Sequence, residues 1–256
     1  MPDFDNSIAV FIDYENMALG MNSNNGGRRK TLFQPDIGKI LERLLEKGRI
    51  VAKRAYCDWQ RFPEAVSYLH GLGVDLLEIP DNNQSGKNSA DIRLAVDAIE
   101  LCHNNAFINT FVIVSGDSDF TPLVSRLKEN GKTIIGVGMR ESTSELLAVN
   151  CDEFIFYEDI GVAADIPTIP DNLSGEKRKA YELLFDSIEA LQRENVETMH
   201  SSMIKDAIRR KAPQFTEAAY GYRSFTRLLE EAQDHGLIKM HKDEKSGTWV
   251  VEGFSA

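Results

Sequence analysis

The chain has 256 residues, of which 42% are hydrophobic and 27% charged, as expected for a globular protein of one large or two modest domains. Its formal net charge of −11 argues against non-specific binding to nucleic acid or an anionic membrane, although a metal in an acidic site would carry its own positive charge. No apolar run approaches the roughly 18 residues of a membrane span and no cationic leader is present, so we expect a cytoplasmic protein without a membrane partner. The three cysteines are far apart and form no CxxC pair, which disfavours disulfide scaffolds and zinc fingers.

Strand-like and helix-like segments alternate from residue 7 to about residue 158. The strand candidates are apolar and rich in β-branched residues, and several of the helical patterns between them end at a glycine. The predicted strands are Ile8–Asp13, Ile50–Cys57, Val74–Ile79, Thr110–Ser115, Thr133–Val137 and Glu153–Tyr157, and the predicted helices are Pro35–Lys47, Phe62–Gly71, Ser89–His103, Phe120–Asn130 and Ser142–Asn150. This order predicts an α/β fold in which helices cover both faces of a mostly parallel sheet.

The pattern changes after residue 160. Residues 161–175 contain Pro167, Pro170 and Gly175, and we interpret them as a linker between a first domain at 1–160 and a second at 176–256. Helical patterns at about 176–193, 199–211 and 222–235 are followed by a predicted β-hairpin. Three helices and a terminal hairpin match a small winged helix-turn-helix domain in order and size.

Carboxylates cluster at the predicted strand ends of the first domain. Asp13 ends the first strand, Asp117 and Asp119 follow the fourth, and Asp91 begins the long third helix. Because functional crevices of open α/β sheets lie at the carboxyl ends of the strands, these four side chains are expected to converge if the strands are neighbours. Oxygen ligands suit Mg²⁺ or Mn²⁺, which would polarise a phosphodiester and lower the pKa of a bound water.

Each of these acids also has a structural interpretation. Asp13 could end a strand and cap a turn, Asp117 could be a turn residue after Gly116, and Asp91 and Asp119 could be helix N-caps. The convergence of several acids therefore matters more than any single one.

Two further polar residues are candidates with open roles. Asn16 could orient a water or a phosphate, or be a turn residue. Asp97 lies six residues after Asp91, roughly 240° round a helix, so both cannot easily face one ion; Asp97 is a supporting catalytic candidate or a structural carboxylate.

Basic residues near the predicted strand ends are candidates for contact with phosphate, or they are simply solvated. They are Arg28, Arg29 and Lys30 in the polar loop 20–31, Lys87 before the acidic helix, and Arg140 after the fifth strand. Arg54, Trp59 and Arg61 near the end of the second strand could offer charge and stacking to a single strand, although Trp59 could instead cover the core.

Competing chemistries have weaker support. Ser115 lacks a GxSxG context, and the segment Gly136–Gly138 is too short for a dinucleotide fingerprint. A phosphatase of the aspartyl-phosphate type expects Asp-x-Asp on the first strand, and position 15 is Glu.

The first domain resembles the NYN domain family, a branch of the PIN-like nucleases, over about residues 7–158. The resemblance is carried by Phe11–Asn16, Ala90–Ala98 and Val114–Leu123, which occur in family order, and by Gly131–Gly138 as the following strand. It implies a PIN-like α/β/α sandwich, a metal site made by Asp13, Asp91, Asp117 and Asp119, and hydrolysis of RNA in the active members. Asn16 and Asp97 match the motifs as further catalytic residues.

The second domain looks like the LOTUS (OST-HTH) winged-helix family. The matching segments are Met203–Pro213, Phe215, Gly221–Ala232 and His235–Ile238. This resemblance implies binding of RNA or protein, with Lys205, Arg209, Arg210, Lys211, Arg223 and Arg227 as basic candidates.

Together these observations predict a cytoplasmic ribonuclease that depends on Mg²⁺ or Mn²⁺. We expect single-stranded RNA as the substrate and RNA or a protein partner for the second domain, and leave a homodimer open. The alternative is a non-catalytic RNA-binding or protein-interaction regulator on a nuclease-like scaffold, because such a protein would share every acidic motif.

Overall fold

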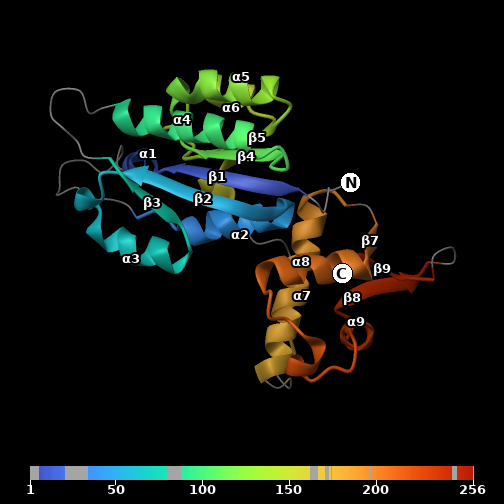
Figure 1. Ribbon diagram of the computed structural model, residues 1–256. Coiled ribbons are helices and arrows are strands. Elements are labelled where there is room, and N and C mark those ends of the chain that lie inside the picture. The colour runs from blue at the N-terminus through green and yellow to red at the C-terminus, as the bar shows by residue number, and fades with distance from the viewer. Residues whose placement is uncertain are drawn as a thin grey trace. The chain divides into compact units, whose positions relative to one another are not determined.

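The computed structural model (Figure 1) describes residues 6–20, 34–79, 88–161, 167–170, 173, 175–196, 198–243 and 247–255. The chain divides into two units, and each is described by itself. The first unit comprises residues 5–44 and 49–162, and the second comprises residues 45–48 and the chain from 163 onward.

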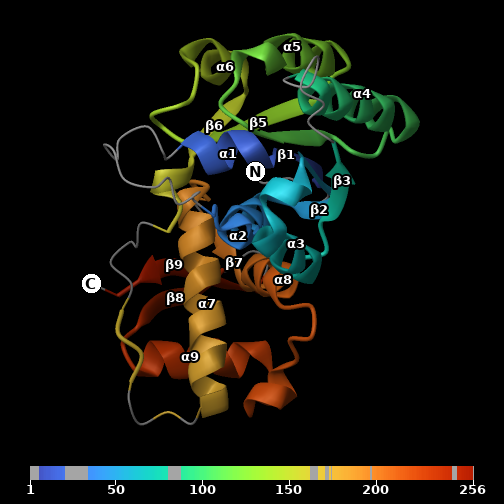
Figure 2. The same cartoon turned by 90° about the vertical axis from the view of Figure 1, so that its left-hand side faces the viewer.

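The first unit is built on a six-stranded sheet in which every neighbouring pair is parallel (Figure 2). Its strands stand in the order β3-β2-β1-β4-β5-β6. Their bounds are Ser7–Asp13 (β1), Arg49–Cys57 (β2), Asp75–Glu78 (β3), Thr110–Val114 (β4), Thr133–Gly138 (β5) and Glu153–Phe156 (β6). This order makes β1 and β4 central neighbours, with the chain running outward in opposite directions after each of them.

Helices cover both faces of this sheet, as Figure 1 shows with α4 and α5 on one side and α2 and α3 on the other. Along β1, Ile8, Val10 and Ile12 pack with α1, α2 and α3, whereas Ala9 and Phe11 pack with α4 and α5. This alternation is the two-residue period of a strand buried on both faces. The helices are Tyr14–Gly20 (α1), Ile37–Lys47 (α2), Pro63–Gly71 (α3), Ser89–Asn104 (α4), Thr121–Glu129 (α5) and Glu145–Asn150 (α6), with short 3₁₀ turns at Trp59–Arg61, Ser118–Phe120 and Tyr157–Asp159.

The predicted α/β fold with a parallel sheet is confirmed, because all six predicted strands are present in order. The structure adds helix α1 directly after β1, a segment for which the sequence predicted no helix. Tyr14, Met17 and Ala18 bury the inner face of α1 in the core. The loop was predicted at residues 20–31, but Gly20 is the last residue of α1; residues 21–31 lie outside the described residues.

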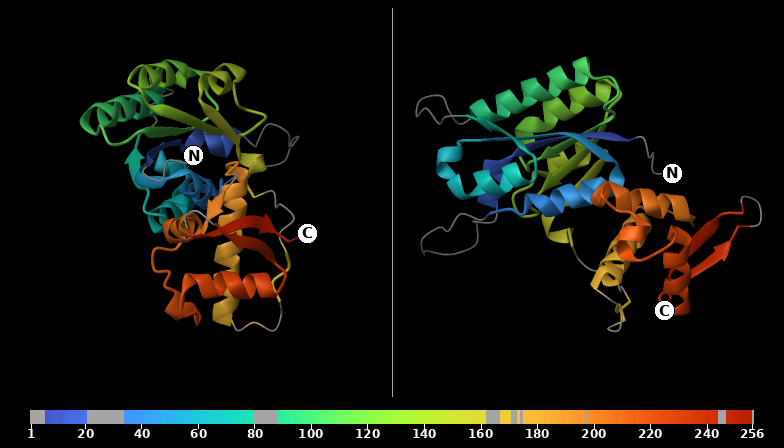
Figure 3. Two further views of the ribbon diagram at one scale, coloured as in Figure 1. Left: turned by 90° about the vertical axis from the view of Figure 1, so that its right-hand side faces the viewer. Right: turned by 60° about the horizontal axis from the view of Figure 1, so that its bottom comes forward.

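Within its described residues, the second unit contains three helices and a three-stranded antiparallel sheet in the order β7-β9-β8. Figure 3 shows this unit from two further sides. Its elements are Gly175–Arg193 (α7), Met199–His200 (β7), Ser201–Lys211 (α8), Glu217–Tyr220 (a 3₁₀ turn), Phe225–Asp234 (α9), Ile238–Lys242 (β8) and Trp249–Phe254 (β9). Residues 199–200 were predicted to begin a helix, but they pair with β9 instead. The assignment to a winged-helix family stays a prediction.

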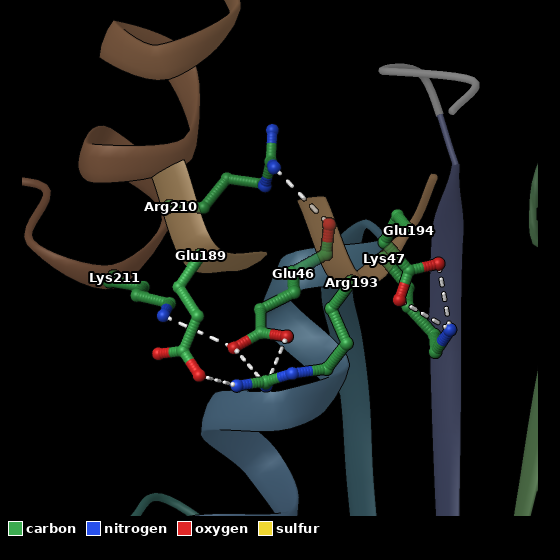
Figure 4. Close-up of polar contacts among 7 residues, drawn as sticks. All are labelled: Glu46, Lys47, Glu189, Arg193, Glu194, Arg210 and Lys211. Carbon is green, nitrogen blue, oxygen red and sulfur yellow. Dashed lines mark hydrogen bonds and ion pairs between the residues drawn. The ribbon is translucent and has the colours of Figure 1, made fainter. Parts of the chain in front are cut away.

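Residues 45–47, the end of α2, belong to the second unit. Ion pairs in this unit gather around the buried Glu46 of that helix end (Figure 4). Glu46 is 8% exposed and its carboxylate accepts from Nη1 of Arg193 at 3.1 Å and from Nζ of Lys211 at 3.3 Å. Beside it, Nζ of Lys47 donates to Glu194 at 2.8 Å. The basic groups neutralise a carboxylate that would otherwise be costly to bury.

None of the helices among the described residues is both long enough and apolar enough to cross a lipid bilayer.

Candidate active site

An acidic pocket opens where β1 and β4 end. These two strands are adjacent, and the strand order reverses between them, which is where open α/β sheets place their ligands. The pocket has a volume of about 410 Å³. Its lining comes from the end of β1 and helix α1, from the start of α4, and from the loops after β4 and β5: Asp13, Glu15, Asn16, Leu19, Gly20, Asn88, Ala90, Asp91, Asp117, Asp119 and Ser142.

Asp13 lies deepest among the acids, at 7% exposure. Its Oδ1 accepts from the backbone N–H of Asn16 at 3.1 Å, which caps the start of helix α1. Its Oδ2 accepts from the Ser115 hydroxyl at 3.0 Å. The Ser115 oxygen in turn accepts from the backbone N–H of Asp117 at 3.2 Å. This chain of hydrogen bonds links the end of β1 to the turn after β4.

Asn16 makes a second link between the same two segments. Its side-chain Oδ1 accepts from the backbone N–H of Gly116 at 2.9 Å. Gly116 has no room for a side chain, because a Cβ there would lie 2.9 Å from both the carbonyl oxygen of Ser142 and Cα of Thr143. The turn after β4 is therefore held between Asn16 on one side and the loop after β5 on the other.

Asp117 caps the 3₁₀ turn that leads into α5. Its Oδ1 accepts from the backbone N–H of Asp119 at 2.9 Å. The sequence had offered Asp119 as the cap of this segment, and the structure gives that role to Asp117, which leaves the Asp119 side chain exposed beside the pocket. Asp91 lies in the first turn of α4 and is half-buried.

The clustering of acids changes their protonation. Burial raises the pKa of Asp13 to about 7, and repulsion from Asp91 and Glu15 adds to the rise, while the hydrogen bonds from Asn16 and Ser115 oppose it. Burial also raises the pKa of Asp91 to about 6, with repulsion from Asp117, Asp119 and Glu15 in the same direction. The pocket is thus a site where negative charge is concentrated and where a cation would relieve the repulsion.

The model of the family described as "NYN domain" matches residues 7–158, which is more than half of the chain. The chain belongs to the NYN domain family. The match covers β1 to β6 and every described residue that lines the acidic pocket. Membership gives this part of the chain a nuclease-like, PIN-like scaffold.

A curated protein sequence and a solved structure are each similar to part of this NYN protein. An uncharacterized protein of Methanocaldococcus jannaschii is 31% identical over 140 residues, which are 55% of this chain and 50% of the relative, so the match spans about half of the relative's length. The crystal structure of a protein of unknown function from Vibrio parahaemolyticus aligns with a TM-score of 0.52 and 22% identity, over 61% of this chain and 96% of that one. The second likeness concerns the fold alone.

The donor set of the NYN pocket fits a hard divalent cation, because its charged groups are carboxylates and its deepest one, Asp13, is repelled by its neighbours. Within the described residues, no group of three or more His, Cys, Asp or Glu side chains is arranged to hold a metal ion as it stands. Side chains among the four aspartates would therefore have to move closer together for one ion to bind three of them at once. Repulsion between carboxylates favours their separation until a cation binds.

Asp97 does not line the acidic pocket. It is 3% exposed, and its carboxylate accepts from the Tyr56 hydroxyl and from Nε of Arg93, both at 2.9 Å, with Nη1 of Arg54 3.9 Å away. Asp97, Arg93 and Arg54 line a second depression of about 510 Å³, to which Asp75 also contributes. The expected separation of Asp97 from Asp91 round the helix is what the structure shows.

The basic candidates of the first domain are placed only in part. Arg140 donates to both oxygens of Asp159, at 2.7 and 2.6 Å, and its guanidinium lies 4.2 Å from the ring centre of Phe156. It does not line the acidic pocket. Arg28, Arg29, Lys30 and Lys87 fall outside the described residues.

The basic candidates of the second unit differ in how they are engaged. Arg210 is half-buried, and its Nε donates to the carbonyl oxygen of Leu45 at 2.8 Å; Figure 4 shows it beside Glu46. Lys205 pairs with Glu217 at 2.6 Å. Arg209 and Arg223 are exposed. Lys211 pairs with Glu46, and Arg227 pairs with Glu230. Of the six candidates, Arg209 and Arg223 are therefore the best placed to meet a ligand from solution.

Glu15 and Ser142 are among the pocket-lining residues that sequence reasoning did not single out. Glu15 was noted only as a departure from a phosphatase pattern, and its place in the pocket follows from helix α1, which was not predicted. Ser142 comes from the loop after β5, and its Oγ is buried without a hydrogen-bond partner among the described residues. Spacing relative to Asp13 could have indicated Glu15, whereas no local pattern indicates Ser142.

Proposed function

We propose that this protein is a metal-dependent ribonuclease that hydrolyses phosphodiester bonds of single-stranded RNA at the acidic pocket. The observation that carries the proposal is the convergence of Asp13, Asp91, Asp117 and Asp119 on one pocket at the strand-order reversal of an NYN domain. Four carboxylates in one small pocket repel one another, and a bound cation cancels that repulsion.

The four aspartates would hold Mg²⁺ or Mn²⁺, with Asp13 as the fixed ligand and the more exposed Asp91, Asp117 and Asp119 completing the site. The ion would supply positive charge that polarises the phosphodiester and makes water a stronger nucleophile. The chain's own contribution is positional. Asn16 and Ser115 lock the ends of β1 and β4 together, so that Asp13 and Asp117 keep one relative placement.

The decisive experiment replaces one pocket carboxylate without disturbing the fold. Asp117→Asn keeps the side-chain oxygen that caps the following turn, so the variant should fold while losing a negative ligand. We expect Mn²⁺-dependent cleavage of a labelled single-stranded RNA to fall by at least about a hundredfold, since the variant removes charge from the ion's site.

The matched control is Asp75→Asn, which removes a carboxylate of the same kind from an exposed position on β3, outside the acidic pocket. It should cleave at the parent rate. Asp13→Asn is expected to behave like Asp117→Asn. Parent-like cleavage by both freshly purified pocket variants would contradict the proposal, as would cleavage that persists in excess EDTA.

A regulator that binds RNA without cutting it is the second candidate. The observation that favours it is that the described carboxylates are not arranged to hold a metal ion as they stand. The same assay separates the two, because the regulator would bind the labelled RNA and leave it intact with and without Mn²⁺.

The second unit would act as a binding module of the winged-helix type. Its three helices and three-stranded antiparallel sheet agree with that arrangement in order and number. Arg209 and Arg223 would contact RNA phosphates, or the module would bind a protein partner. The proposal also includes a homodimer, which light scattering tests. It further includes action in the cytoplasm, which localisation of the tagged protein tests.

A further inference from the structure

A guanidinium stands at the edge of the acidic pocket without belonging to its lining. We propose that Arg61 binds a phosphate of the RNA strand at this edge, and that Glu15 holds the Arg61 side chain in place until the strand arrives. The inference rests on the proposed function, because it assigns a substrate contact to that same pocket.

The turn that carries Arg61 is firmly anchored. Asp58 caps it by accepting from the backbone N–H of Gln60 at 3.1 Å. Trp59 is 6% exposed, its Nε1 donates to the carbonyl oxygen of Leu77 at 3.1 Å, and its ring packs 5.4 Å from that of Tyr14 in α1. Trp59 thus covers the core rather than offering a stacking surface, and it ties the turn to the helix that carries Glu15.

Arg61 itself remains accessible. Its side chain is 39% exposed, and its Nη1 donates to Oε1 of Glu15, which is one of the residues that line the pocket. Its guanidinium lies 5.7 Å from the ring centre of Phe62. An ion pair this exposed contributes only about 0–1 kcal/mol, so a better anionic partner can displace Glu15.

The charge of the pocket creates the need for such a residue. The described lining includes four aspartates and Glu15 but neither Lys nor Arg. An RNA strand carries one negative charge per nucleotide, and a cation in the pocket can contact only the phosphate being cut. The neighbouring phosphate needs its own positive partner to approach a surface this acidic.

Arg61 suits that role better than the other basic candidates that the structure describes near this domain's strand ends. Arg140 is paired with both oxygens of Asp159, away from the pocket, and Arg54 lies near Asp97 in the second depression. A guanidinium binds phosphate with two parallel hydrogen bonds, the same geometry with which it binds a carboxylate. A phosphate that replaces Glu15 can therefore accept the hydrogen bond from Nη1 of Arg61 and add a second one from the same guanidinium.

The test measures RNA binding directly, apart from cleavage. A fluorescently labelled single-stranded hexanucleotide is titrated with the full-length protein in Ca²⁺, and a gel confirms that the RNA stays intact. We expect Arg61→Ala to weaken binding about tenfold and to reduce the slope of log Kd against log salt by about 0.7, the value for one phosphate contact on a single strand. Arg61→Lys keeps the charge but loses the two parallel hydrogen bonds of a guanidinium. Its affinity for the hexanucleotide should lie between those of the parent and of Arg61→Ala.

The matched control is Arg126→Ala. Arg126 also forms an exposed ion pair, with Glu129 at 2.8 Å on α5, and does not line the pocket. This variant removes the same charge and should bind the hexanucleotide like the parent. Glu15→Gln should tighten binding in the parent background and give a smaller gain in the Arg61→Ala background, because the competition for the guanidinium is then absent.

Equal binding by the Arg61→Ala and Arg126→Ala variants, both folded by circular dichroism, would overturn the inference. So would equal gains from Glu15→Gln in the two backgrounds, or absence of binding by the parent. A different result separates the two proposals: if Arg61→Ala weakens binding but no protein cleaves RNA in Mn²⁺, the Arg61 contact stands and the ribonuclease assignment fails.

Discussion

Asp13 shows most clearly that burying a carboxylate beside other acids costs folding free energy. It stands at the end of a strand that is buried from Ile8 onward, and it is itself 7% exposed. Two hydrogen bonds favour its charged form, yet burial and the neighbouring acids outweigh them and raise its pKa to about 7. Without a cation, the folded protein therefore retains a proton on this carboxyl near neutral pH that the unfolded chain would release.

This proton predicts a pH-dependent stability. An ordinary Asp in the unfolded chain has a pKa near 3.8, so between about pH 4 and pH 7 the folded state binds more protons than the unfolded state, and the free energy of unfolding falls as pH rises. Asp91, with a pKa of about 6, acts in the same direction. For Asp13, the rise of the pKa from 3.8 to about 7 corresponds to about 4 kcal/mol.

Asp13→Asn removes this dependence at one site. In EDTA, we expect the difference in Tm between variant and parent (variant minus parent) to increase by several degrees as the pH is raised from about 4.5 to about 7.5. Differential scanning calorimetry measures this difference. Mn²⁺ at neutral pH should raise the Tm of the parent and leave the variant nearly unchanged. A difference in Tm that stays constant across this pH range would contradict the prediction.

At the scale of elements, the strands were predictable because each is a short apolar run with a clear end. Helix α1 was not predicted because Glu15 and Asn16 follow the strand directly and look like a polar turn. Its helical state depends on tertiary contacts: Asp13 caps its backbone, and Met17 and Ala18 pack into the core. The β7 pairing of residues 199–200 with β9 is likewise a long-range contact that no local pattern reports.

The glycines of β5 also acquire a meaning only in the folded element. Gly136 and Gly138, too sparse for a dinucleotide motif, allow close packing on this strand. A Cβ at Gly136 would lie 2.3 Å from Cδ2 of Phe154 and 3.0 Å from Sγ of Cys151. A Cβ at Gly138 would lie 2.5 Å from Oγ1 of Thr143, in the loop that continues to Ser142 and the pocket.

Gly136→Ala should therefore destabilise the first unit. The Phe154 ring would have to move from its place beside Phe156, and such overpacking costs about 1–3 kcal/mol. Urea unfolding monitored by circular dichroism should show a lower midpoint. Gly71→Ala is the control, because no heavy atom lies within 4 Å of the added Cβ in this helix and alanine favours helices. A loss of stability as large in Gly71→Ala as in Gly136→Ala would refute the steric explanation.

At the scale of the whole molecule, charge is unevenly divided along the chain, with most of the acids in the part before residue 176. The gathering of acids at one pocket could be predicted from the sequence, because the carboxyl ends of parallel strands meet at one edge of the sheet. Which basic residues face solvent could not be predicted from the sequence. Arg209 and Arg210 are adjacent in sequence, yet Arg209 is exposed and Arg210 is bonded to a carbonyl oxygen, a difference that only the packing of α8 decides.

This division of charge predicts a division of labour in catalysis. If the second unit holds RNA through exposed cations, Arg209→Ala/Arg223→Ala should raise KM for a long single-stranded RNA about tenfold, since each phosphate contact contributes to affinity, and leave kcat unchanged. A hexanucleotide, which needs only the acidic pocket and its edge, should be cleaved with the parent's KM. The measurement is steady-state cleavage of both substrates in Mn²⁺.

The control double variant, Lys39→Ala/Arg126→Ala, removes two exposed cations from the first unit and should affect neither substrate. A general electrostatic effect would raise KM in both double variants alike, so the comparison between variants excludes it. The comparison between the long RNA and the hexanucleotide then identifies the role of the second unit. An unchanged KM for the long RNA in Arg209→Ala/Arg223→Ala would leave a protein, rather than RNA, as the ligand of the second unit.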